Sequence, residues 1–63
     1  MQIRLDTPVY INGYILVARC IKVEGMDWYR LYKIEDRVIS ILSQAPSEGG
    51  ILQMLLNKIR GLT

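Results

Sequence analysis

The chain has 63 residues, 51% of them hydrophobic, with eight basic and six acidic residues giving a formal net charge of +2. That length allows one domain with a thin core, and the hydrophobic content argues against intrinsic disorder. The charge is too small to indicate nucleic-acid binding by itself. One cysteine and no histidine exclude an internal disulfide and make a zinc site a poor prospect.

The first predicted element is a β-hairpin around Asn12-Gly13. Both residues tolerate the positive φ of a two-residue type I′ turn, and apolar runs flank them on both sides. The facing pairs are then Ile11 with Tyr14, Val9 with Leu16, Leu5 with Cys20, and Asp6 with Arg19. The last pair has opposite charges, which favours this register.

The first strand of this hairpin is predicted over residues 3–11, where apolar and polar residues alternate. Pro8 cannot donate a ladder hydrogen bond, so this strand lies at a sheet edge or breaks there. The second strand, residues 14–23, is apolar on both faces in its first half, which is typical of an interior strand.

The next turn is predicted as a four-residue loop over residues 24–27. The facing pairs are then Val23 with Trp28, Ile21 with Arg30, and Arg19 with Tyr32. A three-residue loop would instead set Arg19 opposite Lys33, and two like charges facing each other destabilise a sheet. The third strand follows over residues 28–34, rich in aromatic residues.

A short turn at Glu35-Asp36 leads to a fourth predicted strand over residues 37–43. The apolar residues of this segment also fit helical spacing, so a helix there is an alternative. The β-branched residues Val38, Ile39 and Ile41 favour a strand.

A C-terminal helix is predicted after Pro46, with Ser47 as its N-cap and Glu48 in its first turn. Because Gly49-Gly50 weakens that turn, the helix begins either there or near Ile51. Gly61 is expected to follow its last turn. The apolar residues form one stripe: Ile51, Leu52, Leu55, Leu56 and Ile59. The predicted fold is a single α+β domain over residues 1–63, a four-stranded antiparallel β-meander, open or curled towards a small barrel, followed by this amphipathic helix.

No catalytic residue, metal site, cofactor or small-molecule substrate is predicted. Cys20 lies on the predicted core face, where a small buried thiol is the expected role. The acidic residues cluster in turns, where solvation explains them. Gly49-Gly50 lacks the lysine and hydroxyl residue of a phosphate-binding loop.

The distribution of side chains over the two sheet faces is the informative feature. One face, which the helix can cover, carries Ile3, Leu5, Val9, Ile11, Leu16, Cys20, Tyr29, Leu31, Val38 and Leu42. The other carries Tyr10, Ile15, Val17, Ile21, Val23, Trp28, Tyr32, Ile34, Ile39 and Ile41, with Arg4, Arg19, Arg30 and Arg37. One helix cannot cover both faces, and an uncovered apolar patch tends to mark a binding surface.

Three interpretations of the second face remain open. It is the interior of a small barrel, the contact between two copies packed sheet to sheet, or the binding site for another macromolecule. Its aromatic and arginine residues are typical of protein–protein hot spots. The predicted partner-binding residues are Tyr10, Arg19, Trp28, Arg30, Tyr32 and Arg37.

The predicted function is that of a non-enzymatic adaptor, inhibitor or regulator that binds another protein, or a second copy as a homodimer. The alternative is a sheet-based DNA- or RNA-binding regulator, with aromatic rings stacking on bases. The aliphatic residues between the arginines favour a protein partner. The lone Cys20, the charged start of the chain and the absence of a membrane-spanning run predict a cytoplasmic location. A small chain without an active site suits an accessory protein of a phage or mobile element.

Overall fold

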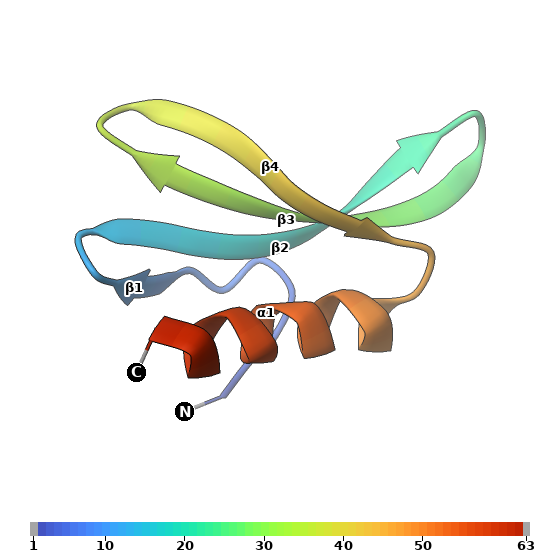
Figure 1. The fold of residues 1–63 in the computed structure, drawn as a ribbon. Helices are drawn as coiled ribbons and strands as arrows, with labels where there is room; N and C mark the ends of the chain where they lie inside the picture. Colours follow the sequence, from blue (N-terminus) through green and yellow to red (C-terminus); the bar gives the residue numbers. More distant parts are fainter. Residues whose placement is uncertain (1, 63) are drawn as a thin grey trace.

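A computed structural model describes residues 2–62 and confirms the α+β class. Four strands form one antiparallel sheet in the order β1-β2-β3-β4, and a single helix follows at the C-terminal end (Figure 1). Their bounds are β1 Val9–Ile11, β2 Tyr14–Val23, β3 Met26–Glu35, β4 Val38–Ala45 and α1 Glu48–Leu62. β1 and β4 lie at opposite edges of the sheet and are not paired with each other, so the meander is open and the barrel interpretation is wrong.

The β1–β2 hairpin has the predicted register. Val9 pairs with Leu16 and Ile11 with Tyr14, and the two turn residues between the strands have φ values of 51° and 82°. These values are typical of the type I′ turn that the Asn-Gly pair predicts.

The first strand is much shorter than the predicted residues 3–11. It begins at Val9, directly after Pro8, whose nitrogen cannot join the ladder. Before Pro8 the chain turns at Leu5-Asp6, with a φ of 62° at Asp6. This segment still follows β2, since the Asp6 backbone N–H donates to the Ala18 carbonyl oxygen at 2.8 Å.

The β2–β3 turn is also shorter than predicted. It has two residues, Glu24 and Gly25, with φ values of 51° and 80°, and Val23 pairs with Met26. The predicted four-residue loop is therefore wrong, because this pair also adopts the left-handed geometry of a type I′ turn. The error shifts the register by two residues, which leaves every side chain on its predicted face.

The last strand extends from Val38 to Ala45, so the helical alternative for residues 37–43 is wrong. The preceding turn lies at Asp36-Arg37, one residue later than predicted, with φ values of 50° and 67°. The β3–β4 pairing contains a register shift: Leu31 pairs with Ser43, but Tyr32 pairs with Ile41. Leu42 is therefore the extra residue of a β-bulge.

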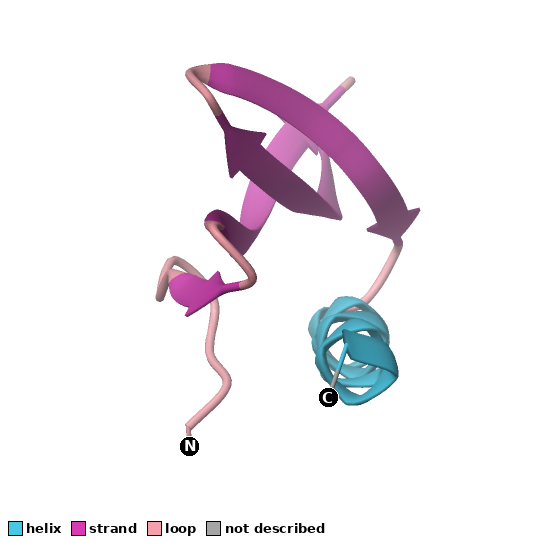
Figure 2. Ribbon diagram, turned by 60° about the vertical axis from the view of Figure 1, so that its left-hand side comes forward, coloured by secondary structure: helices cyan, strands magenta, loops and turns pink. Residues whose placement is uncertain are grey.

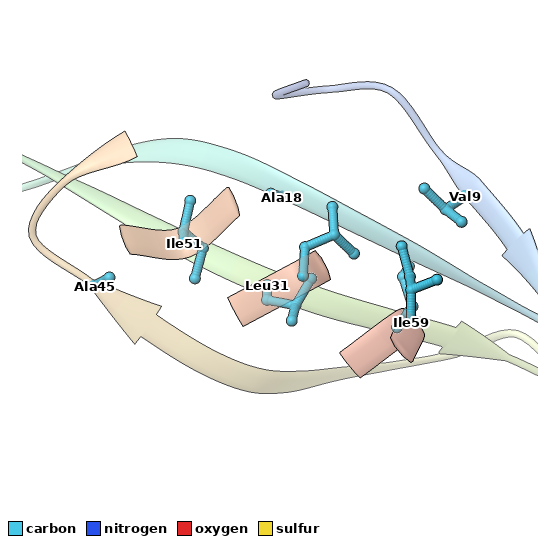
Figure 3. Packing of buried hydrophobic residues seen from close by; sticks show 8 residues of the cluster. Val9, Ala18, Leu31, Ala45, Ile51 and Ile59 are labelled. Atoms are coloured by element: carbon cyan, nitrogen blue, oxygen red, sulfur yellow. The ribbon is translucent and has the colours of Figure 1, made fainter. Parts of the chain in front are cut away.

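Helix α1 packs against one face of the sheet (Figure 2). Its first turn is capped as predicted, since the Gly50 backbone N–H donates to the Ser47 Oγ at 3.1 Å. The helix begins at Glu48 despite the glycine pair, and it includes Gly61, which was predicted to lie beyond its end. The buried core lies between helix and sheet (Figure 3): Val9, Leu16, Ala18, Leu31, Ala45, Ile51, Leu55 and Ile59.

Three residues predicted for this core are exposed instead: Cys20, Val38 and Leu42. Cys20 pairs with Tyr29 near the β2–β3 turn, and that end of the hairpin projects beyond the start of α1 (Figure 1). Val38 lies at the opposite end of the sheet, and Leu42 occupies the bulge. Ile3 and Leu5, although outside any strand, pack against the core as expected.

Candidate functional site

The sheet face opposite α1 is the candidate site. Successive side chains of a strand point to opposite faces, so the neighbours of core residues Leu16, Ala18 and Leu31 point away from the helix. We call this surface the open face: Tyr10, Ile15, Val17, Arg19, Ile21, Val23, Met26, Trp28, Arg30, Tyr32, Ile34, Ile39, Ile41 and Gln44. All of these residues are half-buried or exposed.

Two apolar rows cross the open face. The first joins all four strands, since Tyr10 pairs with Ile15, Ile15 with Ile34, and Ile34 with Ile39. The second row lies two residues further along the strands β2, β3 and β4 and consists of Val17, Tyr32 and Ile41. The rows lie side by side, so they form one continuous apolar surface.

A polar row borders this surface. Arg19 pairs with Arg30, and Arg30 pairs with Gln44. Each guanidinium has a partner, because Arg19 Nε lies 3.1 Å from Asp6 Oδ1 and Arg30 Nε donates to Gln44 Oε1 at 2.9 Å. The Asp6–Arg19 contact is the opposite-charge pair predicted for this hairpin. The row and Asp6 together carry two positive charges and one negative, so this border keeps a net positive charge.

The open face is hollowed rather than flat. Two shallow hollows, of about 380 and 280 Å³, share Val17, Arg19 and Ile34 in their linings. One extends towards Tyr10 and the other towards Tyr32. Both are open to solvent, so they suit protruding side chains of a partner better than an enclosed small molecule.

A third hollow, of about 540 Å³, lies at the end of the sheet between the β1–β2 and β3–β4 turns. Ile34 and Tyr10 line it as well, which makes it continuous with the open face. Glu35, Asp36 and Arg37 supply its charged part. The apolar rows therefore end at a rim that carries both acidic and basic side chains.

Five of the six predicted partner-binding residues lie on the open face: Tyr10, Arg19, Trp28, Arg30 and Tyr32. The sixth, Arg37, lies in the β3–β4 turn at the rim, because the strand begins one residue later than predicted. Arg4 was also expected on this face, but it lies outside the strands and donates a hydrogen bond to the Gln2 side chain. The structure adds two residues to this face. Met26, predicted in a turn, begins β3 opposite Val23. Gln44 lies beyond the predicted end of the last strand, where its alternation with Ser43 and Ala45 up to Pro46 was the available signal.

The titrating groups with shifted pKa values lie elsewhere, near the β2–β3 turn. Asp27 raises the pKa of Lys22 through a hydrogen bond and an ion pair with an Nζ–Oδ1 distance of 2.6 Å. Partial burial raises the pKa of Tyr29, and the neighbouring Cys20 adds to the effect. Within residues 2–62, no group of three or more Cys, Asp or Glu side chains is placed to hold a metal ion.

No helix within the described part of the chain is long and apolar enough to cross a membrane. Comparisons with protein-family models, curated proteins and solved structures found no match. The open face is therefore the feature of the molecule that bears on function.

Proposed function

We propose that the protein is a small non-enzymatic interaction module that binds another protein through the open face. The observation that supports this proposal is the uneven cover of the sheet. Helix α1 packs on one face only, and the other keeps two apolar rows, one of which includes Tyr32, with Arg30 in the adjacent polar row and Trp28 beyond it. Tryptophan, tyrosine and arginine are the residues most enriched at the hot spots of protein interfaces.

The engagement of the arginines favours a protein over a nucleic acid. Arg19 is held by Asp6 and Arg30 by Gln44, so neither guanidinium is arranged for a phosphate contact alone. Binding to a nucleic-acid backbone depends on such contacts. The aliphatic rows beside them add little to a phosphate-tracking surface, whereas they match the apolar centre of a protein interface.

The geometry also supports an expectation about the chemistry of the partner. An apolar side chain would fill the hollows around Val17 and Ile34. An acidic or carbonyl group would meet the positive polar row at Arg30. We therefore expect an apolar surface with acidic groups at its border. The exposed Cys20 thiol suits a reducing compartment such as the cytoplasm.

Affinity capture with matched variants tests this function. Ile34→Glu places a charge where all three hollows meet, and Met54→Glu places the same charge on the exposed side of α1. A partner protein from the native host should be retained by the wild type and by Met54→Glu at high salt, and lost with Ile34→Glu. The circular dichroism of both variants establishes that they are folded.

Binding of the isolated partner can then be followed through Trp28, the only tryptophan in the chain. Its place on the open face means that a bound partner should shift its fluorescence. Retention that disappears with nuclease treatment or moderate salt would support a nucleic-acid partner instead. Equal retention by Ile34→Glu and the wild type would contradict the proposal.

A further inference from the structure

The edge strand β4 carries a second unsatisfied surface. It is eight residues long, and its sequence, VISILSQA, contains no charged residue and no proline. Natural proteins usually protect an edge strand with charges, proline or short length, because its outer backbone N–H and C=O groups can pair with another strand. Half of the exposed large hydrophobic side chains of the described chain lie here: Val38, Ile39, Ile41 and Leu42, with exposed fractions of 61%, 65%, 55% and 37%.

The opposite edge is protected. β1 has three residues, directly preceded by Pro8 and by the turn at Asp6. β1 is therefore too short to pair with another strand, and the part of β2 that extends beyond it carries Arg19 and Lys22, charges of the kind that protect an edge. This leaves β4 as the unprotected edge of the described sheet. A chain with one such edge forms a closed pair rather than a fibre, since pairing uses the same patch on both copies.

We propose that β4 pairs antiparallel with β4 of a second copy about a two-fold axis, joining two four-stranded sheets into one. The inference does not depend on the proposed function, because it uses the backbone edge of β4 rather than the open face. A second copy matches this edge well. With no charge anywhere on β4, no like charges meet in self-pairing, and two rows of isoleucine side chains cover each other.

The bulge and the alternation of faces restrict the register, and within these limits we place the axis at Ser40. The bulge at Leu42 limits the regular part of the strand to residues 38–41. Opposite residues in an antiparallel pair point to the same face, so the axis must pass beside a residue rather than between two. An axis at Ser40 sets Ile39 opposite Ile41 of the second copy on the open face, and the two serines opposite each other on the helix side.

Small size adds a reason for this assembly. A domain of this length has a thin core and often gains stability from a second subunit. A typical stable interface takes roughly 800 Å² from each partner, and the chain exposes 4390 Å² in all. The paired edge would also extend the open faces of both copies into one continuous surface.

Molar mass in solution tests the proposal. The wild type should give twice the 7.3 kDa of one chain by light scattering or sedimentation at micromolar concentration. Ser40→Glu should give the mass of one chain, because the two introduced carboxylates would face each other across the axis. Within one copy the same change is favourable, since Ser40 pairs with Lys33. Met54→Glu, the matched control on α1, should leave the mass doubled.

Disulfide trapping checks the register independently. With Cys20→Ser as background, Ser40→Cys should give a covalent dimer under mild oxidation, and Met54→Cys should not. A wild type of single-chain mass at all concentrations would contradict the proposal. A dimer that persists in Ser40→Glu, without trapping through Ser40→Cys, would place the contact elsewhere and also contradict it. The molar mass and the disulfide trapping do not depend on whether Ile34→Glu abolishes capture of the partner. This proposal and the proposed function can therefore fail separately.

Discussion

Arg19 and Arg30 lie directly opposite each other on the central strands β2 and β3, with their side chains on the same face of the sheet. Two like charges in this position destabilise a sheet. Here each guanidinium is drawn to a different neighbour, Arg19 to Asp6 and Arg30 to Gln44. The segment before β1 thus supplies the charge that allows this pairing.

Removal of that charge should expose the repulsion. We expect Asp6→Asn to lower the free energy of unfolding by about 0.5–1 kcal/mol at low salt, through a lost ion pair and an uncompensated arginine pair. Asparagine also tolerates the positive φ at this position, so the turn itself should survive. Because salt screens exposed charges, the loss should shrink as salt rises. Urea unfolding at two salt concentrations measures both effects.

Asp27→Asn is the control for this experiment. Asp27 also pairs with a cation across two strands, Lys22, but these two opposite charges face each other directly, so this pair does not offset two facing like charges. Its removal should cost less than that of Asp6 at low salt. An equal cost for the two variants would show that Arg19–Arg30 repulsion contributes nothing.

The parts of the fold that follow from local chemistry were predictable from the sequence. Asn12-Gly13 defines both the turn and the register of its hairpin, and Ser47 defines the start of the helix. The two sheet faces were also predictable, because an error of two residues in the β2–β3 loop leaves the alternation unchanged.

The remaining features depend on tertiary geometry. The exposure of Cys20 follows from the place where α1 begins under the sheet, which no local pattern reports. The bulge at Leu42 likewise arises from the pairing with β3. Residues 3–8 alternate like a strand, but the chain turns at Asp6, which has a left-handed φ. Because this residue is not a glycine, the sequence did not indicate the turn.

The two glycines at the start of α1 should respond differently to alanine. A Cβ at Gly49 would meet nothing within 4 Å, whereas a Cβ at Gly50 would lie 3.0 Å from the Ser47 Oγ and 3.4 Å from the Ala45 Cβ. Gly49→Ala should raise the free energy of unfolding by about 0.5–1 kcal/mol, the usual gain of alanine over glycine in a helix. Gly50→Ala should gain less or lose stability, because it crowds the cap.

Thermal and urea unfolding of the two variants check this difference, with Ser47→Ala as a third arm. Loss of the capping hydrogen bond should lower stability by about 1 kcal/mol. Equal gains from both glycine substitutions would show that the cap is not crowded at Gly50.

Arg37 allows stability and binding to be separated. It has a φ of 67° in the β3–β4 turn, a conformation that costs a non-glycine residue roughly 1 kcal/mol or more. Arg37→Gly should therefore stabilise the fold in urea unfolding. If the rim of the open face contacts the partner, the same variant should bind it more weakly, as measured through Trp28 fluorescence. Unchanged affinity would restrict the interface to the strands.

Stability should fall in alkaline solution because of two groups near the β2–β3 turn. Folding raises the pKa of Lys22 above 10.5, through Asp27, and that of Tyr29 above 10.0, chiefly through burial. In both cases the folded chain holds the proton more tightly than the unfolded chain. The unfolded chain then binds fewer protons in this pH range, so the free energy of unfolding decreases as pH rises.

The contribution of Lys22 is thus fully present below pH 10.5 and is lost as the pH passes its raised pKa. The decline should be measured between pH 9.5 and 11.5, about one unit either side of the ordinary pKa of lysine. Asp27→Asn should make the decline in this range less steep. Tyr29→Phe should also make the decline less steep, because it removes the second group. The double variant should show a smaller slope of stability against pH than either single variant. Urea unfolding at closely spaced pH values provides the measurement. A wild-type slope that both variants retain would assign the alkaline loss to other groups.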